Sequence, residues 1–98
     1  MVKHMIIWKF KDDVIDKQDK AIAIKEALEA LAGKIDGLIE MHILTNKLEV
    51  SSGDIMMDSS FTDQNALGNY QNHPLHQAAA NNFVRPFMNQ RLSFDYEM

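Results

Sequence analysis

The first residues of the chain alternate in a way that predicts a β-strand with two apolar faces. From Val2 to Lys11 the even positions carry valine, histidine, isoleucine, tryptophan and phenylalanine, and the odd positions Met5 and Ile7 are apolar as well. Successive side chains of a strand point to opposite faces, so both faces of this strand need cover. Because one layer of helices covers only one face, the pattern predicts a further partner for the other.

A helix is predicted next, over residues 16–34. Its apolar side chains recur at spacings of three and four residues, as they do on one face of a helix: Ile24, Leu28, Leu31 and Ile35. Asp16 is expected to cap the N-terminus, where a short acceptor satisfies free amides, and Gly33 is expected to end the helix.

Three further strands are predicted from alternating apolar residues between turn signals, at residues 38–48, 54–61 and 89–96. In the first of these three, the odd positions form the apolar face.

The chain from Thr62 to Arg85 is predicted to form a helical region that is broken at Pro74. Thr62 or Asp63 is expected to cap a short first helix, and a second helical segment begins at Pro74, because proline has no amide hydrogen to lose at the first helical position. The residue before a proline is pushed out of helical geometry, so the chain changes direction at His73.

The predicted order is strand, helix, strand, strand, broken helix, strand, which gives an α+β fold class. This is the ferredoxin-like split βαβ arrangement, a four-stranded antiparallel sheet with helices on one face. The second apolar face of the first strand then predicts a homodimer in which two sheets face each other about a two-fold axis. Residues 1–98 are expected to form a single domain, because a chain of this length builds one core.

Composition and charge narrow the range of partners. Fourteen acidic and ten basic residues give a net charge of -4, and no cluster of lysine or arginine is available to neutralise phosphates, so we expect no nucleic-acid partner. The absence of cysteine excludes disulfides, thiolate metal sites and cysteine nucleophiles. The apolar run from Met5 to Trp8 is too short for a signal peptide or a membrane span, so we expect a cytoplasmic protein without membrane contacts.

The stretch NYQNHPLHQ, residues 69–77, concentrates the candidate chemistry, and three interpretations are open. In the first, His73 caps a helix while Tyr70 and His76 fill the edge of the core. In the second, His73 and His76 form a metal pair, but a residue before proline need not share a helical face with its neighbour, and we expect no metal site. In the third, Tyr70 and His76 converge with His4 on a cavity, where histidine passes protons and tyrosine polarises a carbonyl.

Three motifs together resemble one family. The opening VKHMIIWKFKDD, the central HPLH after Tyr70 and the ending VRPFMNQRLSFDYE occur in the order and spacing of the stress-responsive dimeric α+β barrel (Dabb) domain family. The resemblance covers essentially the whole chain. It implies the ferredoxin-like fold and a homodimer with a barrel between the two sheets, and most members have no assigned reaction.

The family includes plant olivetolic acid cyclase, which implies a specific chemistry. That enzyme closes a ring in a linear polyketide by intramolecular aldol condensation without a cofactor. Carried over by motif position, the resemblance implies His76 as the base, Tyr70 as its assistant and His4 as a neighbour in the pocket. His73 and Trp8 are further candidate pocket-binding residues.

Other residues with chemical potential have more ordinary expectations. Asp58 stands where the family commonly has an apolar residue, so it is either exposed or tunes the dimer interface or pocket, and a partner is needed if it faces the sheet interior. His42 is expected to be a satisfied strand histidine, and Arg85 to pair with a carboxylate or cap a helix end. The sequence has no glycine-rich phosphate loop and no Gly-x-Ser-x-Gly motif, so we expect no cofactor.

Two functional hypotheses follow. The first is a stress-responsive α+β barrel domain protein of unassigned activity that binds an apolar small molecule in a pocket lined by histidine and tyrosine. The second is a cofactor-independent acid-base enzyme with polyketide cyclase-like aldol chemistry on a β-keto or aromatic small molecule. The sequence does not distinguish the two hypotheses, because pocket volume and ring orientation depend on the three-dimensional structure.

Overall fold

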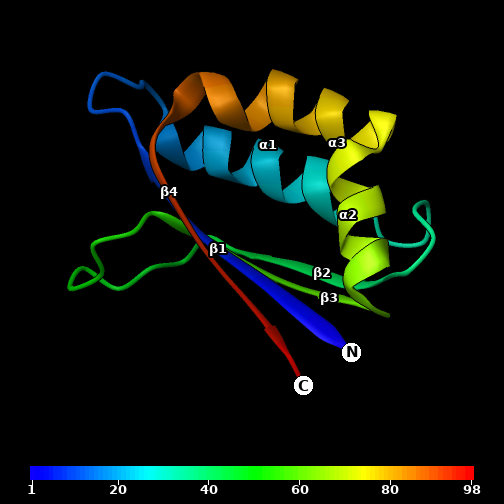
Figure 1. Ribbon diagram of the computed structural model, residues 1–98. Helices are drawn as coiled ribbons and strands as arrows, with labels where there is room; N and C mark the ends of the chain where they lie inside the picture. The colour runs from blue at the N-terminus through cyan, green and yellow to red at the C-terminus, as the bar shows by residue number, and fades with distance from the viewer.

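A computed structural model describes residues 1–98 and shows one sheet with a layer of helices on one of its faces (Figure 1). In chain order the elements are β1 (Val2–Phe10), α1 (Lys17–Glu29), β2 (Leu38–Leu44), β3 (Ile55–Phe61), α2 (Gln64–Asn72), α3 (Pro74–Ala79) and β4 (Met88–Glu97), with a π-helical turn at Ala80–Val84 and a 3-10 turn at Arg85–Phe87. The strand order is β2-β3-β1-β4, and every neighbouring pair is antiparallel. The predicted α+β, ferredoxin-like fold is therefore confirmed.

β1 lies inside the sheet, between β3 and β4, and its even positions face the helices. His4, Ile6 and Trp8 are all buried on this side. Ile6 and Trp8 belong to the same apolar core as Ile24 and Leu28 of α1. The predicted alternation of β1 is confirmed, and it places a histidine and a tryptophan in the layer between sheet and helices.

α1 occupies the predicted place, but neither of its ends is built as predicted. Asp16 precedes α1, yet its side chain makes no capping hydrogen bond, because a φ of 57° places it in the left-handed region and not in the extended geometry of a usual N-cap. α1 ends at Glu29, and Leu31 and Ile35 lie in the turns that follow, where both are still buried. No helix of the structure combines the length and apolar character that crossing a membrane requires.

β2 is shorter than predicted and carries an irregularity that changes its apolar face. The register with β3 shifts between Leu38 and Glu40. Leu38 consequently joins Met41 and Ile43 in the core, while Ile39 is exposed. The prediction that all odd positions share one face is wrong at Ile39, since an extra residue in one strand reverses the alternation around it.

The side of the sheet away from the helices, called the open face below, is covered by no element of the chain (Figure 1). Its apolar side chains are Met5 and Ile7 of β1, Leu44 of β2, Met56 of β3, and Leu92, Phe94 and Tyr96 of β4. The register sets Phe94 opposite Met5 and Leu92 opposite Ile7, so apolar side chains of two strands adjoin. A contiguous apolar area of this kind is a mark of an interaction surface.

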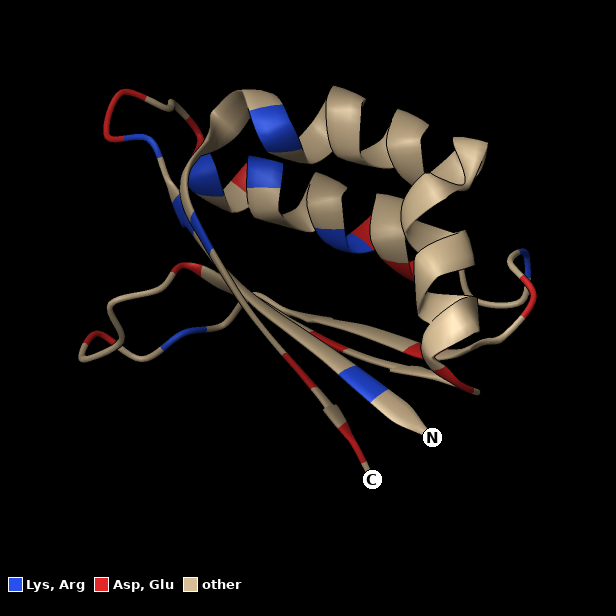
Figure 2. Cartoon of the chain, in the orientation of Figure 1, with Lys and Arg blue, Asp and Glu red and all other residues tan.

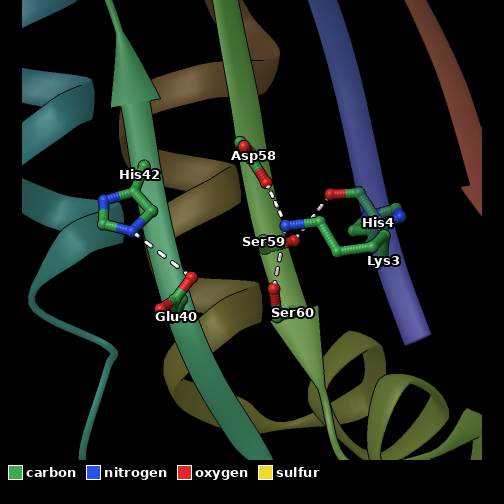
Figure 3. A network of polar contacts seen from close by, with 7 residues as sticks. All are labelled: Lys3, His4, Glu40, His42, Asp58, Ser59 and Ser60. Carbon is green, nitrogen blue, oxygen red and sulfur yellow. Dashed lines mark hydrogen bonds and ion pairs between the residues drawn. The ribbon is translucent and has the colours of Figure 1, made fainter. Parts of the chain in front are cut away.

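One corner of the open face is polar (Figure 3). Lys3 Nζ donates hydrogen bonds to Asp58 Oδ1 at 2.5 Å and to Ser60 Oγ at 2.9 Å, and the bond to Asp58 raises the pKa of Lys3. Asp58 thereby has the partner that a carboxylate on a sheet surface needs. His42 is exposed on β2, with its Nε2 3.7 Å from a carboxylate oxygen of Glu40.

Candidate functional site

The helical region breaks at His73, between α2 and α3, as the His-Pro dipeptide predicts. His73 has an extended backbone, with φ of -70° and ψ of 136°, and Pro74 occupies the first turn of α3. The Nδ1 atom of His73 accepts a hydrogen bond from the Leu75 amide at 3.1 Å. His73 is therefore a helix cap, and it does not line the cavity that the other candidate residues share.

The break frees one backbone carbonyl, that of Gln71, to orient His76. In a continuous helix this carbonyl would accept from the amide of Leu75, four residues on, but that amide is bound to His73. The Gln71 oxygen instead lies 3.1 Å from Nδ1 of His76 and accepts from Nε2 of Gln77 at 2.6 Å. A carbonyl only accepts, so Nδ1 of neutral His76 carries the hydrogen and Nε2 is left with its lone pair.

A cavity of about 480 Å³ lies between the helices and the sheet. It has the size of a small-molecule site. Four of the five residues singled out from the sequence line it, namely His4, Trp8, Tyr70 and His76. Half of the lining residues are hydrophobic, so the cavity combines an apolar wall with a few polar groups.

Tyr70 brings a hydroxyl to this cavity from the buried face of α2. The residue is 1% exposed, and its ring lies 5.0 Å from that of Phe61 and 4.3 Å from that of His76, measured between centroids. Its hydroxyl has no hydrogen-bond partner in the chain, yet no enclosed polar atom lacks one, so the hydroxyl is reached from the cavity. Burial raises the pKa of Tyr70 above its ordinary value, which keeps the hydroxyl a hydrogen-bond donor.

His76 is held in its neutral form. Burial lowers the pKa of His76 below its ordinary value, the bond to Gln71 partly opposes this, and the positive charges of Arg85 and Arg91 lower it further. Burial and the arginine charges both disfavour the charged imidazolium. At neutral pH the ring is therefore a base whose free nitrogen is Nε2.

His4 enters the cavity from β1, paired with a carboxylate that the sequence analysis did not single out. The antiparallel register sets His4 opposite Asp95 of β4, and the two side chains are joined through Nδ1 of the imidazole and Oδ1 of the carboxylate. The backbone carbonyl of His4 also accepts a hydrogen bond from the buried Ser59 hydroxyl at 2.7 Å (Figure 3). No group of three histidine, aspartate or glutamate side chains is arranged to hold a metal ion.

Arg85 and Arg91 complete the polar lining of the cavity. Arg85 was expected to pair with a carboxylate or cap a helix end, but its guanidinium donates to the amide oxygens of Gln77 and Asn81. Arg91 lies on β4 opposite Trp8. The antiparallel pairing of β1 and β4 sets Arg91 beside Trp8 and Asp95 beside His4. The sequence analysis missed both residues, because finding them requires the register of the two strands.

The sequence of the chain is similar to a known protein family and to an individual protein. A family model described as the stress responsive A/B barrel domain (Dabb) matches residues 2–98. An uncharacterized protein of Streptomyces coelicolor is 32% identical over 79 residues, which are 80% of this chain and 81% of that protein.

Two solved structures are similar throughout. A dimeric protein of unknown function with a ferredoxin-like fold from Bacteroides fragilis aligns with a TM-score of 0.91 and 29% identity over 99% of this chain and 95% of its own. A hydroxynitrile lyase from Passiflora edulis aligns with a TM-score of 0.71 and 20% identity over 97% and 90% of the two chains.

Proposed function

The chain belongs to the stress responsive A/B barrel domain family, and we propose that it acts as a homodimer. We further propose that it binds a small ketone and removes a proton from it without a cofactor. The observation that carries this proposal is the state of His76. Its imidazole is neutral, its tautomer is fixed by the Gln71 carbonyl, and the residue lines a cavity of ligand size.

The proposed step is the abstraction of a proton from the carbon beside a carbonyl group. Nε2 of His76 takes the proton, the electron pair of the broken C–H bond moves into the carbonyl group, and the product is an enolate. The hydroxyl of Tyr70 donates a hydrogen bond to the carbonyl oxygen, where the negative charge develops. In an intramolecular aldol addition the enolate carbon attacks a second carbonyl of the same molecule, and His76 returns the proton to the new alkoxide, which gives a β-hydroxy ketone; loss of water from this product would complete a condensation.

The surroundings of the two residues support this assignment. The ring centroids of Tyr70 and His76 are 4.3 Å apart, so both polar tips can contact one small molecule. The raised pKa of Tyr70 and the lowered pKa of His76 separate a donor from a base in one cavity. The hydroxynitrile lyase from Passiflora edulis has the same fold, so the fold is compatible with an enzyme.

Ligand binding without turnover is the second candidate function. Half of the residues that line the cavity are hydrophobic, and an apolar wall holds a ligand by shape alone. In this case the neutral state of His76 is only a result of its burial.

The exchange of carbon-bound hydrogen for deuterium in D2O separates the two candidates. Acetophenone and related aryl and β-keto ketones are incubated with the protein, and proton NMR follows the signal of the carbon beside the carbonyl. The wild type is expected to accelerate the exchange, and His76→Ala to lose about 100-fold or more of that acceleration. His42→Ala is the matched control, because it removes a histidine from the open face.

Each outcome selects one reading. If the ketones shift the NMR signals of His76 without accelerated exchange, the chain binds and does not turn over. If His76→Ala keeps the full rate of exchange, His76 is not the base. If no ketone shifts the His76 signals or accelerates the exchange, the cavity does not hold this class of ligand.

The homodimer is supported by the open face. Phe94 is 69% exposed on it and Leu92 is 73% exposed, and the similar protein from Bacteroides fragilis is dimeric. Phe94→Glu is expected to give a monomer by light scattering at micromolar concentration, because a charge is costly to bury in an apolar interface. Ile15→Glu, which changes an exposed residue outside the sheet, should remain dimeric. A wild-type mass equal to that of one chain would refute the dimer.

A further inference from the structure

The two arginines of this chain both line the cavity. All other basic residues apart from histidine are lysines, and none of the lysines lines it. No aspartate or glutamate is among the lining residues either. The charged groups of the lining are therefore two guanidiniums without a carboxylate to balance them.

Acidic residues are also absent from a long part of the sequence that contributes to the cavity. The chain carries a net charge of -4, yet no acidic residue occurs between Gln64 and Phe94. This part of the chain forms α2, α3 and most of β4, and it supplies most of the residues that line the cavity. Figure 2 shows α2 and α3 without red, and a blue stretch on the helical turns that lead into β4.

Arg91 has no partner of its own. It makes no hydrogen bond or ion pair among the side-chain contacts of the structure. Asp95 lies on the same face of β4, but four residues along a strand correspond to about 13 Å, which is too far for an ion pair. The carboxylate of Asp95 contacts His4 instead.

Arg85 is held in place by neutral groups. Nη1 donates to the side-chain oxygens of Gln77, at 3.1 Å, and Asn81. A guanidinium has five N–H donors, so the edge formed by Nε and Nη2 stays available for an anion. Gln77 is itself bound to the Gln71 carbonyl, at 2.6 Å, so the carbonyl that orients His76 also supports Arg85.

The two guanidiniums act directly on the candidate catalytic groups. Their charges lower the pKa of His76, and the charge of Arg91 also acts on the hydroxyl of Tyr70. The electric field of both arginines therefore reaches the place where the ligand would react. A negative group bound there would offset this field and raise the pKa of His76.

We propose that the ligand of this cavity is a small keto acid whose carboxylate is bound by Arg85 and Arg91. The inference rests on the proposed function, because it names the chemical class of the molecule on which His76 acts. A guanidinium binds a carboxylate through two parallel N–H···O bonds, which fixes the orientation of the acid as well as its position. In this arrangement the two guanidiniums hold the carboxylate, and the ketone carbonyl faces Tyr70 and His76.

A pair of probes that differ only in charge tests this proposal: 3-benzoylpropanoate and its methyl ester. Both carry the same aryl ketone. The chain has one tryptophan and two arginines, so NMR of the 15N-labelled protein gives one indole signal and two arginine Nε–H signals, which the variants Arg85→Gln and Arg91→Gln assign. Lys34→Gln is the control for loss of one positive charge, since Lys34 is exposed and does not line the cavity.

The acid is expected to shift both arginine signals and the Trp8 signal, to raise the pKa of His76, and to bind about tenfold or more tightly than the ester. Arg85→Gln and Arg91→Gln should each remove most of this preference, because each removes one of the two guanidiniums that bind the carboxylate. Both arginines are exposed, so both variants are expected to fold.

The results distinguish this proposal from the one on which it rests. If the acid and the ester shift Trp8 and His76 equally, and neither moves the arginine signals, the cavity binds ketones but has no carboxylate site. If acid and ester both leave Trp8, His76 and the arginines unchanged, the ketone site and the carboxylate site are refuted together. Retention of the preference for the acid in Arg91→Gln would refute the role of that residue.

Discussion

Gly33 and Gly37 form a natural pair for testing how tightly α2 is packed on the turn before β2. Both have a φ of +85°, where a side chain is strained, but their surroundings differ. A Cβ added at Gly33 would meet nothing within 4 Å. A Cβ added at Gly37 would lie 2.4 Å from the Cβ of Ala66, which is fixed to the backbone of α2 and cannot rotate away.

The two substitutions to alanine should therefore differ in cost. The left-handed conformation costs about 1–2 kcal/mol for alanine, and the lower entropy of the unfolded chain returns about 0.4–1 kcal/mol, so Gly33→Ala should destabilise by about 1 kcal/mol. Gly37→Ala adds an overlap in a packed region, which costs about 1–3 kcal/mol more. Its total loss is then about 2–4 kcal/mol.

Urea denaturation of both variants measures the difference, with an unchanged slope as the sign that the unfolded state is the same. The double variant Gly37→Ala, Ala66→Gly should lose less than the sum of the single changes, because it removes the overlapping atom. Equal losses for Gly33→Ala and Gly37→Ala, or simple additivity in the double variant, would refute this account of the packing. Ala66 lies one helical turn before Tyr70, so the overlap also bears on the position of the candidate hydrogen-bond donor.

Three further predictions concern pH and capping. The pKa of His76 is lower in the folded chain than the ordinary 6.5, so the unfolded chain binds more protons as the pH falls through 6.5 and stability decreases; His76→Gln should show a smaller decrease in urea denaturation. Burial raises the pKa of Asp54, but hydrogen bonds from Lys47 and the Phe10 amide bring it below 3.8; Asp54→Asn should cost about 1–3 kcal/mol at neutral pH. Because this stability is lost as the pH falls through the folded pKa, the difference from wild type should shrink toward acidic pH. His73→Ala removes the cap of α3 and should cost about 1 kcal/mol by thermal denaturation.

The parts of the fold that local rules govern were predictable from the sequence. The alternation of β1 identifies its buried face, and the pairing of proline with a preceding histidine identifies the break at His73. Asp63 was one of two expected caps for α2, and its Oδ1 accepts from the Ala66 amide at 2.8 Å. In each case the decisive contact lies within a few residues of the side chain concerned.

The parts that depend on register or on backbone detail were not predictable in this way. The bulge that exposes Ile39 arises from the pairing of β2 with β3, and the left-handed backbone of Asp16 prevents the cap that its side chain could make. The contact of His4 with Asp95 joins residues far apart in the chain. The tautomer of His76 is fixed by a carbonyl that is free only because the helix breaks, which no spacing of side chains reveals.

The position of β4 at the edge of the sheet affects when this strand forms during folding and how readily it opens. It is held to the sheet through β1 alone, none of its residues is buried, and its pairing sets Val2 opposite Glu97. Contacts between residues so far apart form late in folding, and a strand with little buried surface is the first to open. In hydrogen exchange the amides of β4 should therefore lose protection before those of β3. Any molecule that binds folded β4 then stabilises the whole sheet, by an amount that grows with the logarithm of its concentration, and a second copy of the chain would act in the same way.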